Sequence, residues 1–282
     1  MKEIHHITLN SKHNNRPFLV DVRYNPTNQT KPIILFIHGF KGFKDWGHFN
    51  LVADFFMRSG FVYAKLNTSL NGTTPEHTTD FVDLEAFGQN NFSIELDDIE
   101  VTIDHLFSEA SPVPPGEIDL QKLYLIGHSR GGGLALMKAA EDKRVKKVAS
   151  WAAINDLEKR WPEEALSAWQ KEGVQYIYNA RTDQQMPLYY QIVEDFHEHR
   201  DRLDIPNIVK RLDQPLLFLH GTADETLPYR MAEEMKAWNP ESELMLIDNG
   251  SHTFGGAHPW EGDEIPHHSQ LAIDRTLAFF NK

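Results

Sequence analysis

One stretch, residues 123–140, limits the possible folds of this chain more than any other. It begins with the apolar run Leu-Tyr-Leu-Ile, typical of a fully buried strand, and ends with small and apolar residues that predict a helix. Between them lies Gly-His-Ser-Arg-Gly, residues 127–131, which fits the pattern G-x-S-x-G. A strand, this pattern and a helix in succession predict a sharp turn that holds the central Ser129 in a strained backbone conformation. The stretch therefore predicts a nucleophilic serine.

The remainder of the chain alternates strands with helices. Apolar runs predict strands at residues 3–9, 17–24, 33–37, 61–66, 145–153, 215–220 and 243–247. Apolar residues at helical spacing predict helices at residues 47–59, 93–107, 228–238 and at the end of the chain. This alternation is typical of an α/β fold in which helices cover both faces of a mostly parallel central sheet.

Two segments near the start of the chain have their own signals. Asn14 and Asn15 separate the first two predicted strands, so we expect an antiparallel hairpin there. Residues 67–91 have no clear periodicity, and we expect a long irregular segment of the kind that is often functional.

Residues 155–210 interrupt the alternation, and we interpret them as an inserted lid. Pro162 followed by two glutamates predicts a helix start, and residues 174–178 alternate like a strand. Residues 186–196 fit both a strand and a helix, so the sequence leaves these two possibilities open. The α/β core is then expected to consist of residues 1–154 and 211–282.

Charge and composition narrow the classes of partner. The formal net charge is −13 with no evident basic cluster, so nucleic acids and anionic membrane surfaces are disfavoured. No apolar run approaches the roughly 20 residues of a membrane helix. Without cysteine, the chain can form no disulfide, thiol nucleophile or cysteine zinc site. We expect a cytoplasmic protein, because the first residues lack the apolar stretch of a signal peptide.

Histidine is frequent, with 15 residues, so a single histidine carries little information. The pairs His5-His6 and His267-His268 are expected to be solvated, and we predict no metal site. No cofactor is expected either. A homodimer is compatible with the sequence, which does not define the oligomeric state.

Three residues after predicted strands have the chemistry of an activated serine. A serine hydroxyl is a poor nucleophile that needs a nearby base, and the base needs an orienting group. His252 follows the last predicted strand in a glycine-flanked loop, and Asp224 follows the strand before it. An ionised Asp224 would fix the tautomer of His252 and stabilise its imidazolium. We therefore predict Ser129, Asp224 and His252 as nucleophile, acid and base, the chain order that this kind of turn favours.

Asp156 is the alternative acid, because it follows the neighbouring predicted strand and could also present a carboxylate to the histidine. Two other histidines receive supporting roles. We expect His38 to support the loop that follows it, and His128 to pack or to make a local hydrogen bond.

Acyl transfer also requires backbone N–H groups that stabilise the oxyanion of the transition state. Arg130, directly after the serine, offers one N–H, and Phe40 offers the other from a loop that leaves a central strand. Loss of one such donor typically lowers the rate by roughly 100- to 1000-fold. We predict these two residues as the oxyanion hole.

At these motifs the chain resembles the α/β-hydrolase family. The motifs are His-Gly-Phe, Gly-His-Ser-Arg-Gly-Gly, His-Gly-Thr-Ala-Asp and Gly-Ser-His, in the family's order, and the resemblance covers roughly residues 15–282. It implies the α/β-hydrolase fold with a variable lid, and it implies that Ser129, Asp224 and His252 are the triad. The branch it resembles contains feruloyl and cinnamoyl esterases, dienelactone hydrolase-like enzymes and prolyl oligopeptidase-like catalytic domains. Serine at the turn argues against haloalkane dehalogenases and epoxide hydrolases, which use a carboxylate there.

The sequence thus predicts a serine hydrolase that cleaves a small-molecule carboxylic ester through an acyl-enzyme. One alternative is a peptidase of the oligopeptidase type that acts without a propeller domain, since only about 30 residues precede the His-Gly-Phe strand. The other is a non-catalytic binding protein on the same fold, although a binding protein has no need of all three triad residues.

The lid is rich in large aromatic residues, which on a surface segment normally need a partner. Aromatic rings also recognise flat apolar groups by stacking and edge contacts. We therefore expect an ester with an aromatic or medium-length apolar group, and we predict that some lid aromatics bind it. The candidates are Trp161, Trp169, Tyr176, Tyr178 and Tyr189.

Overall fold

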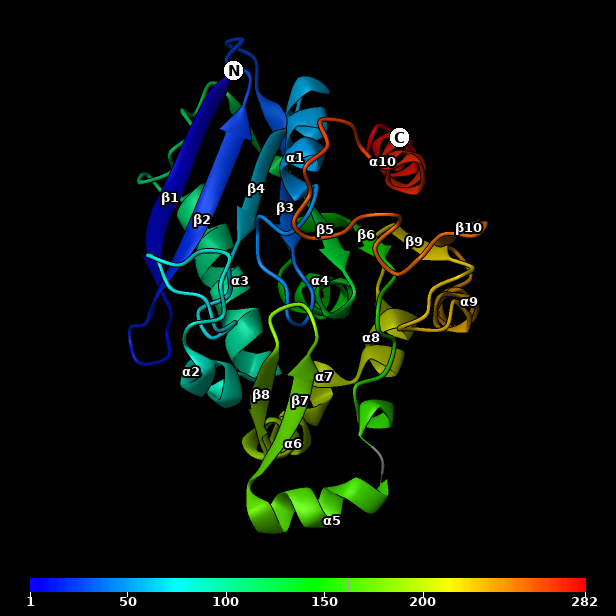
Figure 1. Cartoon of the computed structure of the whole chain (residues 1–282). Coiled ribbons are helices and arrows are strands. Elements are labelled where there is room, and N and C mark those ends of the chain that lie inside the picture. The colour runs from blue at the N-terminus through cyan, green and yellow to red at the C-terminus, as the bar shows by residue number, and fades with distance from the viewer. Residues whose placement is uncertain (162) are drawn as a thin grey trace.

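The computed structural model describes residues 1–161 and 163–282 and has an eight-stranded sheet at its centre (Figure 1). The strands lie in the order β1-β2-β4-β3-β5-β6-β9-β10. β2 pairs antiparallel with β1 and with β4, and the other neighbouring strands are parallel. The strands are β1 (Lys2–Asn10), β2 (Pro17–Tyr24), β3 (Lys31–Ile37), β4 (Val62–Leu66), β5 (Ile118–His128), β6 (Val145–Trp151), β9 (Leu216–Gly221) and β10 (Glu243–Ile247).

The predicted hairpin joins β1 and β2, whose ladder ends at the pair Asn10 and Pro17. Asn14 and Asn15 adopt φ angles of 55° and 51°. Asparagine tolerates this left-handed region better than most residues, which explains the two asparagines in the connection.

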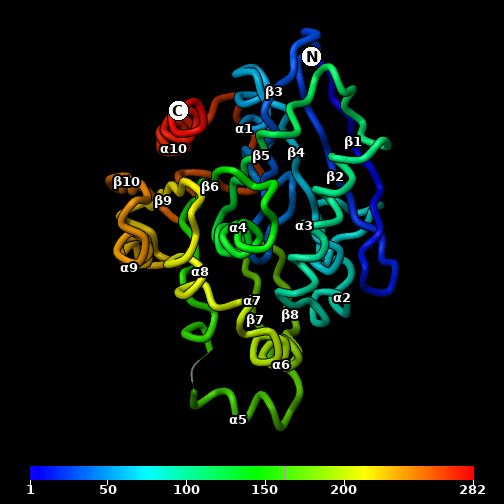
Figure 2. The backbone as a smooth tube through the Cα atoms, turned by 180° about the vertical axis from the view of Figure 1, so that it is seen from behind, coloured from blue at the N-terminus to red at the C-terminus, as the bar shows by residue number. Residues whose placement is uncertain are grey.

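Helices cover both faces of the sheet because its central strands are apolar on both sides. Ile34 and Phe36 of β3 pack toward α1 and α10, whereas Ile33, Leu35 and Ile37 pack toward α3 and α4. Figure 2 shows α4 at the centre of its face, between α3 and α8. The prediction of an α/β fold with helices on both faces is therefore confirmed. The covering helices are α1 (Phe49–Arg58), α3 (Phe92–Phe107), α4 (Arg130–Glu141), α8 (Ile205–Arg211), α9 (Arg230–Trp238) and α10 (His267–Phe280).

The segment interpreted as a lid extends beyond the sheet (Figure 1) and contains a separate two-stranded antiparallel sheet, β7–β8. β8 ends at Tyr189 and α6 begins at Gln191, so the strand and helix patterns of this region belong to consecutive elements. Pro162 lies outside the described residues. The limits of the lid stay a prediction, since α8 at its end packs against α4 and α9. The elements are η1 (Glu158–Arg160), α5 (Glu163–Glu172), β7 (Val174–Asn179), β8 (Gln184–Tyr189), α6 (Gln191–Glu198) and α7 (Arg200–Leu203).

The expected irregular segment at residues 67–91 contains one helix that the sequence analysis does not predict, α2 (Leu84–Gln89). Its N-cap residue Asp83 accepts a hydrogen bond from the backbone N–H of Ala86 at 2.9 Å. A helix of six residues is too short to show a repeating apolar face, so only the cap could have indicated it.

Candidate active site

Ser129 stands between a strand and a helix, since β5 ends at His128 and α4 begins at Arg130. Its φ and ψ angles are 57° and −119°, a conformation that L-residues rarely adopt. The surrounding backbone holds it there: the Ser129 N–H donates to the Trp151 carbonyl at 2.8 Å, and its own carbonyl accepts from Gly132 at 3.0 Å. The sharp turn predicted from the G-x-S-x-G pattern is therefore present.

Glycines allow the backbone segments around this serine to approach closely. A Cβ atom on Gly127 would lie 2.1 Å from the Gly131 carbonyl oxygen, which no side chain can do. A Cβ atom on Gly39 would lie 2.9 Å from the Cβ of Ser129. The loop after β3 therefore packs directly against the serine, where a developing oxyanion would form.

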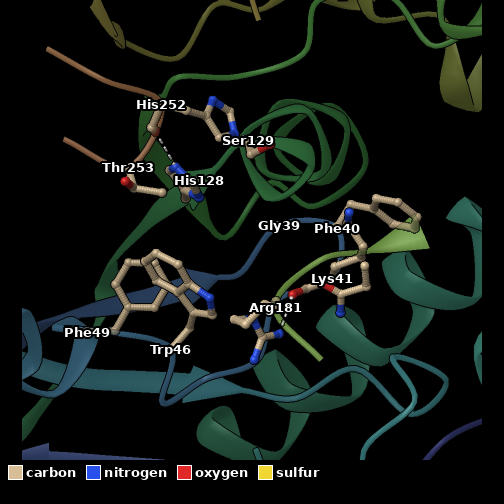
Figure 3. Close-up of a pocket in the computed structure, with 12 residues that line it drawn as sticks. Gly39, Phe40, Lys41, Trp46, Phe49, His128, Ser129, Arg181, His252 and Thr253 are labelled. Carbon is tan, nitrogen blue, oxygen red and sulfur yellow. Dashed lines mark hydrogen bonds between the residues drawn. The ribbon is translucent and has the colours of Figure 1, made fainter. Parts of the chain in front are cut away.

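The structure brings Ser129, His252 and Asp224 together from three separate loops. His252 Nε2 lies 3.0 Å from Ser129 Oγ, and His252 Nδ1 lies 2.8 Å from Asp224 Oδ2. Figure 3 shows His252 next to Ser129 among the residues that line a cavity. The alternative acid, Asp156, instead accepts from the Lys159 N–H at 3.2 Å. The hydrogen-bond geometry therefore favours Asp224 as the partner of His252.

Four donors surround the Asp224 carboxylate. Its Oδ1 accepts from the backbone N–H groups of Thr226 and Leu227, each at 2.8 Å. Its Oδ2 lies 2.8 Å from His252 Nδ1 and 3.0 Å from His220 Nε2. Burial alone would raise the pKa of Asp224, but the hydrogen bonds from His220, His252 and Leu227 lower it below its usual value. This carboxylate is therefore ionised near neutral pH.

The sequence analysis does not identify His220 as a site residue. It is fully buried at the end of β9, and its Nε2 also lies 3.0 Å from the Leu227 carbonyl oxygen. In the sequence, only the short spacing between His220 and Asp224 in His-Gly-Thr-Ala-Asp could have indicated that the two side chains meet.

His128 holds the loop that carries His252. Its Nε2 lies 2.8 Å from the His252 carbonyl oxygen, so this nitrogen carries the proton and donates. Burial, together with the nearby His252, lowers the pKa of His128 to about 3, which keeps the ring neutral.

His38 supports the loop after β3, as the sequence suggests. Its Nε2 accepts from the Thr68 N–H at 3.3 Å, and its Nδ1–H donates to the Gly39 carbonyl at 2.9 Å. Burial lowers the pKa of His38 to about 4, so it is neutral and fixed as this tautomer.

The two predicted oxyanion donors, Phe40 and Arg130, border the same cavity as Ser129 and His252. Arg130 is the first residue of α4, so its backbone N–H has no partner within the helix and lies at the positive end of the helix dipole. The Arg130 guanidinium lies 4.2 Å from the centre of the Phe40 ring, which joins the two residues through their side chains as well. Glu95 Oε1 lies 3.7 Å from the same guanidinium.

Two cavities meet at Ser129. The smaller has a volume of about 180 Å³ and extends past Trp46 and Phe49 to Lys41 and Arg181 (Figure 3). The larger, of about 460 Å³, lies under the segment interpreted as a lid. Its apolar walls include Phe92, Ile154, Leu157, Trp161, Ile177 and Leu188.

Of the five lid aromatics, only Trp161 borders either cavity. Side chains alternate along β7, and its odd positions Gln175 and Ile177 border the larger cavity. Tyr176 and Tyr178 therefore project to the other face and are 62% and 52% exposed. Neither tyrosine lines the cavities beside Ser129, and their contact with substrate stays a prediction.

Trp169 and Tyr189 also lie away from both cavities. Trp169 is buried within the lid, where its Nε1–H donates to the Leu188 carbonyl at 2.9 Å. The Tyr189 hydroxyl donates to Glu85 of α2, and its ring covers Gly88. These aromatics hold the lid together and attach it to α2, which explains their density without a substrate contact.

Two structural features are absent from residues 1–161 and 163–282. No helix there is long and apolar enough to cross a membrane. No group of three histidine or carboxylate side chains in this part of the chain could hold a metal ion.

Solved structures with the same fold include several hydrolases. Est1E from Butyrivibrio proteoclasticus, solved with ferulic acid bound, is 17% identical, with a TM-score of 0.71 and coverage of 98% of each chain. The esterase domain of a Rhodothermus marinus protein is 16% identical, with a TM-score of 0.63 and coverage of 100% of this chain and 97% of that one. A puromycin-hydrolysing peptidase from Mycobacterium tuberculosis is 16% identical, with a TM-score of 0.65 and coverage of 99% of this chain but 39% of the peptidase.

No curated protein matches the sequence. A family model does: the BD-FAE model matches residues 20–238, which include the β3 loop, the G-x-S-x-G turn and Asp224. These residues make up more than half of the chain, and the resemblance noted from the motifs is confirmed. The protein therefore has the α/β-hydrolase fold, and the chain belongs to the BD-FAE family.

Proposed function

We propose that the protein is a serine hydrolase that cleaves carboxylic esters through an acyl-enzyme. One observation carries the proposal: Ser129 Oγ lies 3.0 Å from His252 Nε2, whose other ring nitrogen lies 2.8 Å from a buried carboxylate. This arrangement supplies a serine hydroxyl with the base and the orienting group that it needs.

In the proposed mechanism, Ser129 Oγ attacks the ester carbonyl carbon while His252 Nε2 accepts the hydroxyl proton. Asp224 stabilises the resulting imidazolium, and the N–H groups of Phe40 and Arg130 bind the oxyanion. The imidazolium then protonates the leaving alcohol, which departs and leaves the acyl group on Ser129. Water, deprotonated by His252, attacks the acyl-enzyme, and the acid is released with the serine restored.

The larger cavity is the proposed site of an aromatic or medium-length apolar substrate group. Its apolar walls and volume of about 460 Å³ suit such a group, because the cavity removes it from water and offers ring contacts. Ferulic acid bound to the similar Est1E supports an aromatic acyl group.

The test is the variant Ser129→Ala. Because the residues of a triad act as a unit, kcat for p-nitrophenyl esters should fall by roughly 10⁴-fold or more. The variant should also lose labelling by a fluorophosphonate probe while keeping the circular dichroism of the parent. A folded variant that retains most of its ester turnover would exclude Ser129 as the nucleophile.

A peptidase activity is the second candidate, and the likeness to the puromycin-hydrolysing peptidase favours it. Esters and aminoacyl-p-nitroanilides assayed side by side separate the two activities, since only a peptidase turns over the anilides efficiently. A non-catalytic binding protein is the third candidate, and it predicts no fluorophosphonate labelling of Ser129 at all.

A further inference from the structure

The smaller cavity beside Ser129 has two cationic side chains in its wall, Lys41 and Arg181. Figure 3 shows both with Trp46 on one side of the cavity, and Ser129 with His252 on the other. We propose that this cavity is a carboxylate subsite and that the physiological ester carries an anionic group on the part that enters it. The inference rests on the proposed ester hydrolysis and adds the charge of the substrate.

Within residues 1–161 and 163–282, the ammonium group of Lys41 has no anionic partner. In the part of the chain outside residue 162, no carboxylate lies within 4 Å of Lys41 Nζ, and Nζ donates no hydrogen bond to the protein. Burial and the nearby Arg181 both lower the pKa of Lys41. An anion placed between the two cations would offset both effects, because an opposite charge favours the charged form of each group.

The backbone at Lys41 also indicates that its side chain has a role. Gly39 and Gly42 close a tight turn, in which the Gly42 N–H donates to the Gly39 carbonyl at 3.0 Å. Lys41 occupies the third position of this turn with a φ of 54°, where glycine or asparagine is normally found. A lysine in this conformation is strained, and such strain is characteristic of functional sites.

Arg181 comes from a different element, the tip of the β7–β8 hairpin. Its guanidinium lies 5.3 Å from the ring centres of Phe43 and Phe81, and one N–H donates to the Lys41 carbonyl at 3.4 Å. These contacts fix the group but use few of its five N–H donors. Asp80 acts on Arg181 only from beyond 4 Å, too far for an ion pair. The remaining donors can bind a planar carboxylate.

The charge of the whole molecule makes this pair unusual. With 41 acidic and 28 basic residues, the protein repels anions at long range. Lys41 and Arg181 lie next to the serine without carboxylate partners among the described residues. They can therefore attract an anion locally although the protein as a whole repels it. Because the cavity is only about 180 Å³, its ligand must be a small group at one end of the substrate.

The experiment compares esters that differ only in charge. One pair places the charge on the alcohol side, para-acetoxybenzoate against para-acetoxybenzamide. The other places it on the acyl side, p-nitrophenyl hydrogen adipate against p-nitrophenyl adipamate. In at least one pair, kcat/KM for the carboxylate should exceed that for the amide by about 10- to 100-fold, the range expected for charge-assisted hydrogen bonds. The favoured pair identifies which side of the ester enters the cavity.

Variants then assign the preference to the two cations. Lys41→Met and Arg181→Met should each lower the ratio of kcat/KM for the carboxylate ester to kcat/KM for the amide ester. Because a general loss of catalysis affects both esters equally, it cancels in this ratio. Lys122→Met, which removes the same charge from an exposed site, should leave the ratio unchanged. Lys41→Gly should lower the ratio without lowering Tm, because glycine is unstrained at this φ.

Two results would overturn the inference: no carboxylate preference in either pair, or a preference that both methionine variants retain. The wild-type preference should also shrink between about 0.01 and 1 M salt, as the Debye length falls from about 30 to about 3 Å. Failure of the proposed ester hydrolysis has a different signature: either the wild type turns over none of the four esters, or their turnover survives in Ser129→Ala.

Discussion

The hydrogen-bond partners of Asp224 make this carboxylate the one that can orient His252. Four donors converge on its two oxygens, and they come from His252, His220 and the loop after β9. Asp156, the other acid that the sequence offers, is occupied by the Lys159 backbone and side chain. We therefore expect the same substitution, Asp to Asn, to change kcat differently at these two positions.

Asp224→Asn should lower kcat for p-nitrophenyl esters by up to roughly 10⁴-fold, because an amide no longer fixes the tautomer of His252. Asp156→Asn, its matched control, should change kcat by much less, since it does not contact His252. Single-turnover kinetics with both purified variants measure this directly. The reverse ranking would move the acid to the end of β6.

At the level of single residues, the sequence identifies the groups that carry a motif but not every residue that supports them. Ser129 and His252 stand out by their glycine-rich loops. His220 does not, because its closeness to Asp224 depends on how the loop after β9 turns back. The hydrogen bond from His128 to the His252 carbonyl joins residues 124 positions apart, so the sequence could not indicate it either.

At the level of elements, continuous apolar runs predict the strands of the core well, because a strand buried on both faces consists mostly of apolar residues. The lid is harder to predict. The alternation of Val174, Tyr176 and Tyr178 indicates a strand, but it does not say which face meets the cavity. That depends on how the β7–β8 hairpin lies over Ser129, which only the tertiary structure defines.

Trp161 lines the larger cavity and the lid tyrosines do not, so we expect the proposed aromatic preference to depend on Trp161. Trp161→Ala should lower the ratio of kcat/KM for cinnamoyl over acetyl p-nitrophenyl esters by about 2- to 10-fold, the value of one aromatic contact. Tyr176→Ala and Tyr178→Ala remove equally large side chains from exposed positions and should leave this ratio unchanged. A ratio that responds to the tyrosines and not to Trp161 would place substrate on the outer face of β7.

At the level of the whole molecule, the sequence predicts the α/β architecture but not the charges inside it. Lys44 is fully buried, and its Nζ lies 2.5 Å from Asp21 Oδ2 and 2.5 Å from Asp45 Oδ2. Lys65 contacts the same two carboxylates. These four residues join β2, β4 and the loop after β3, so they attach the antiparallel edge of the sheet to the loop that precedes the active site. Sequence periodicity cannot reveal them, because the contacts join residues from three separate segments of the chain.

Removing one member of this network should destabilise the whole fold. Lys44→Met leaves Asp21, which is 1% exposed, with Lys65 at 3.6 Å as its remaining lysine partner, and breaking a buried pair in this way typically costs about 3–5 kcal/mol. Urea unfolding at neutral pH measures the free energy of unfolding, and Lys122→Met, an exposed control, should change it by less than about 0.5 kcal/mol. The double variant Asp21→Asn with Lys44→Met should recover part of the loss, because the uncompensated carboxylate is gone. A Lys44→Met protein as stable as the parent, or a double variant less stable than the single one, would show that solvent already compensates these charges.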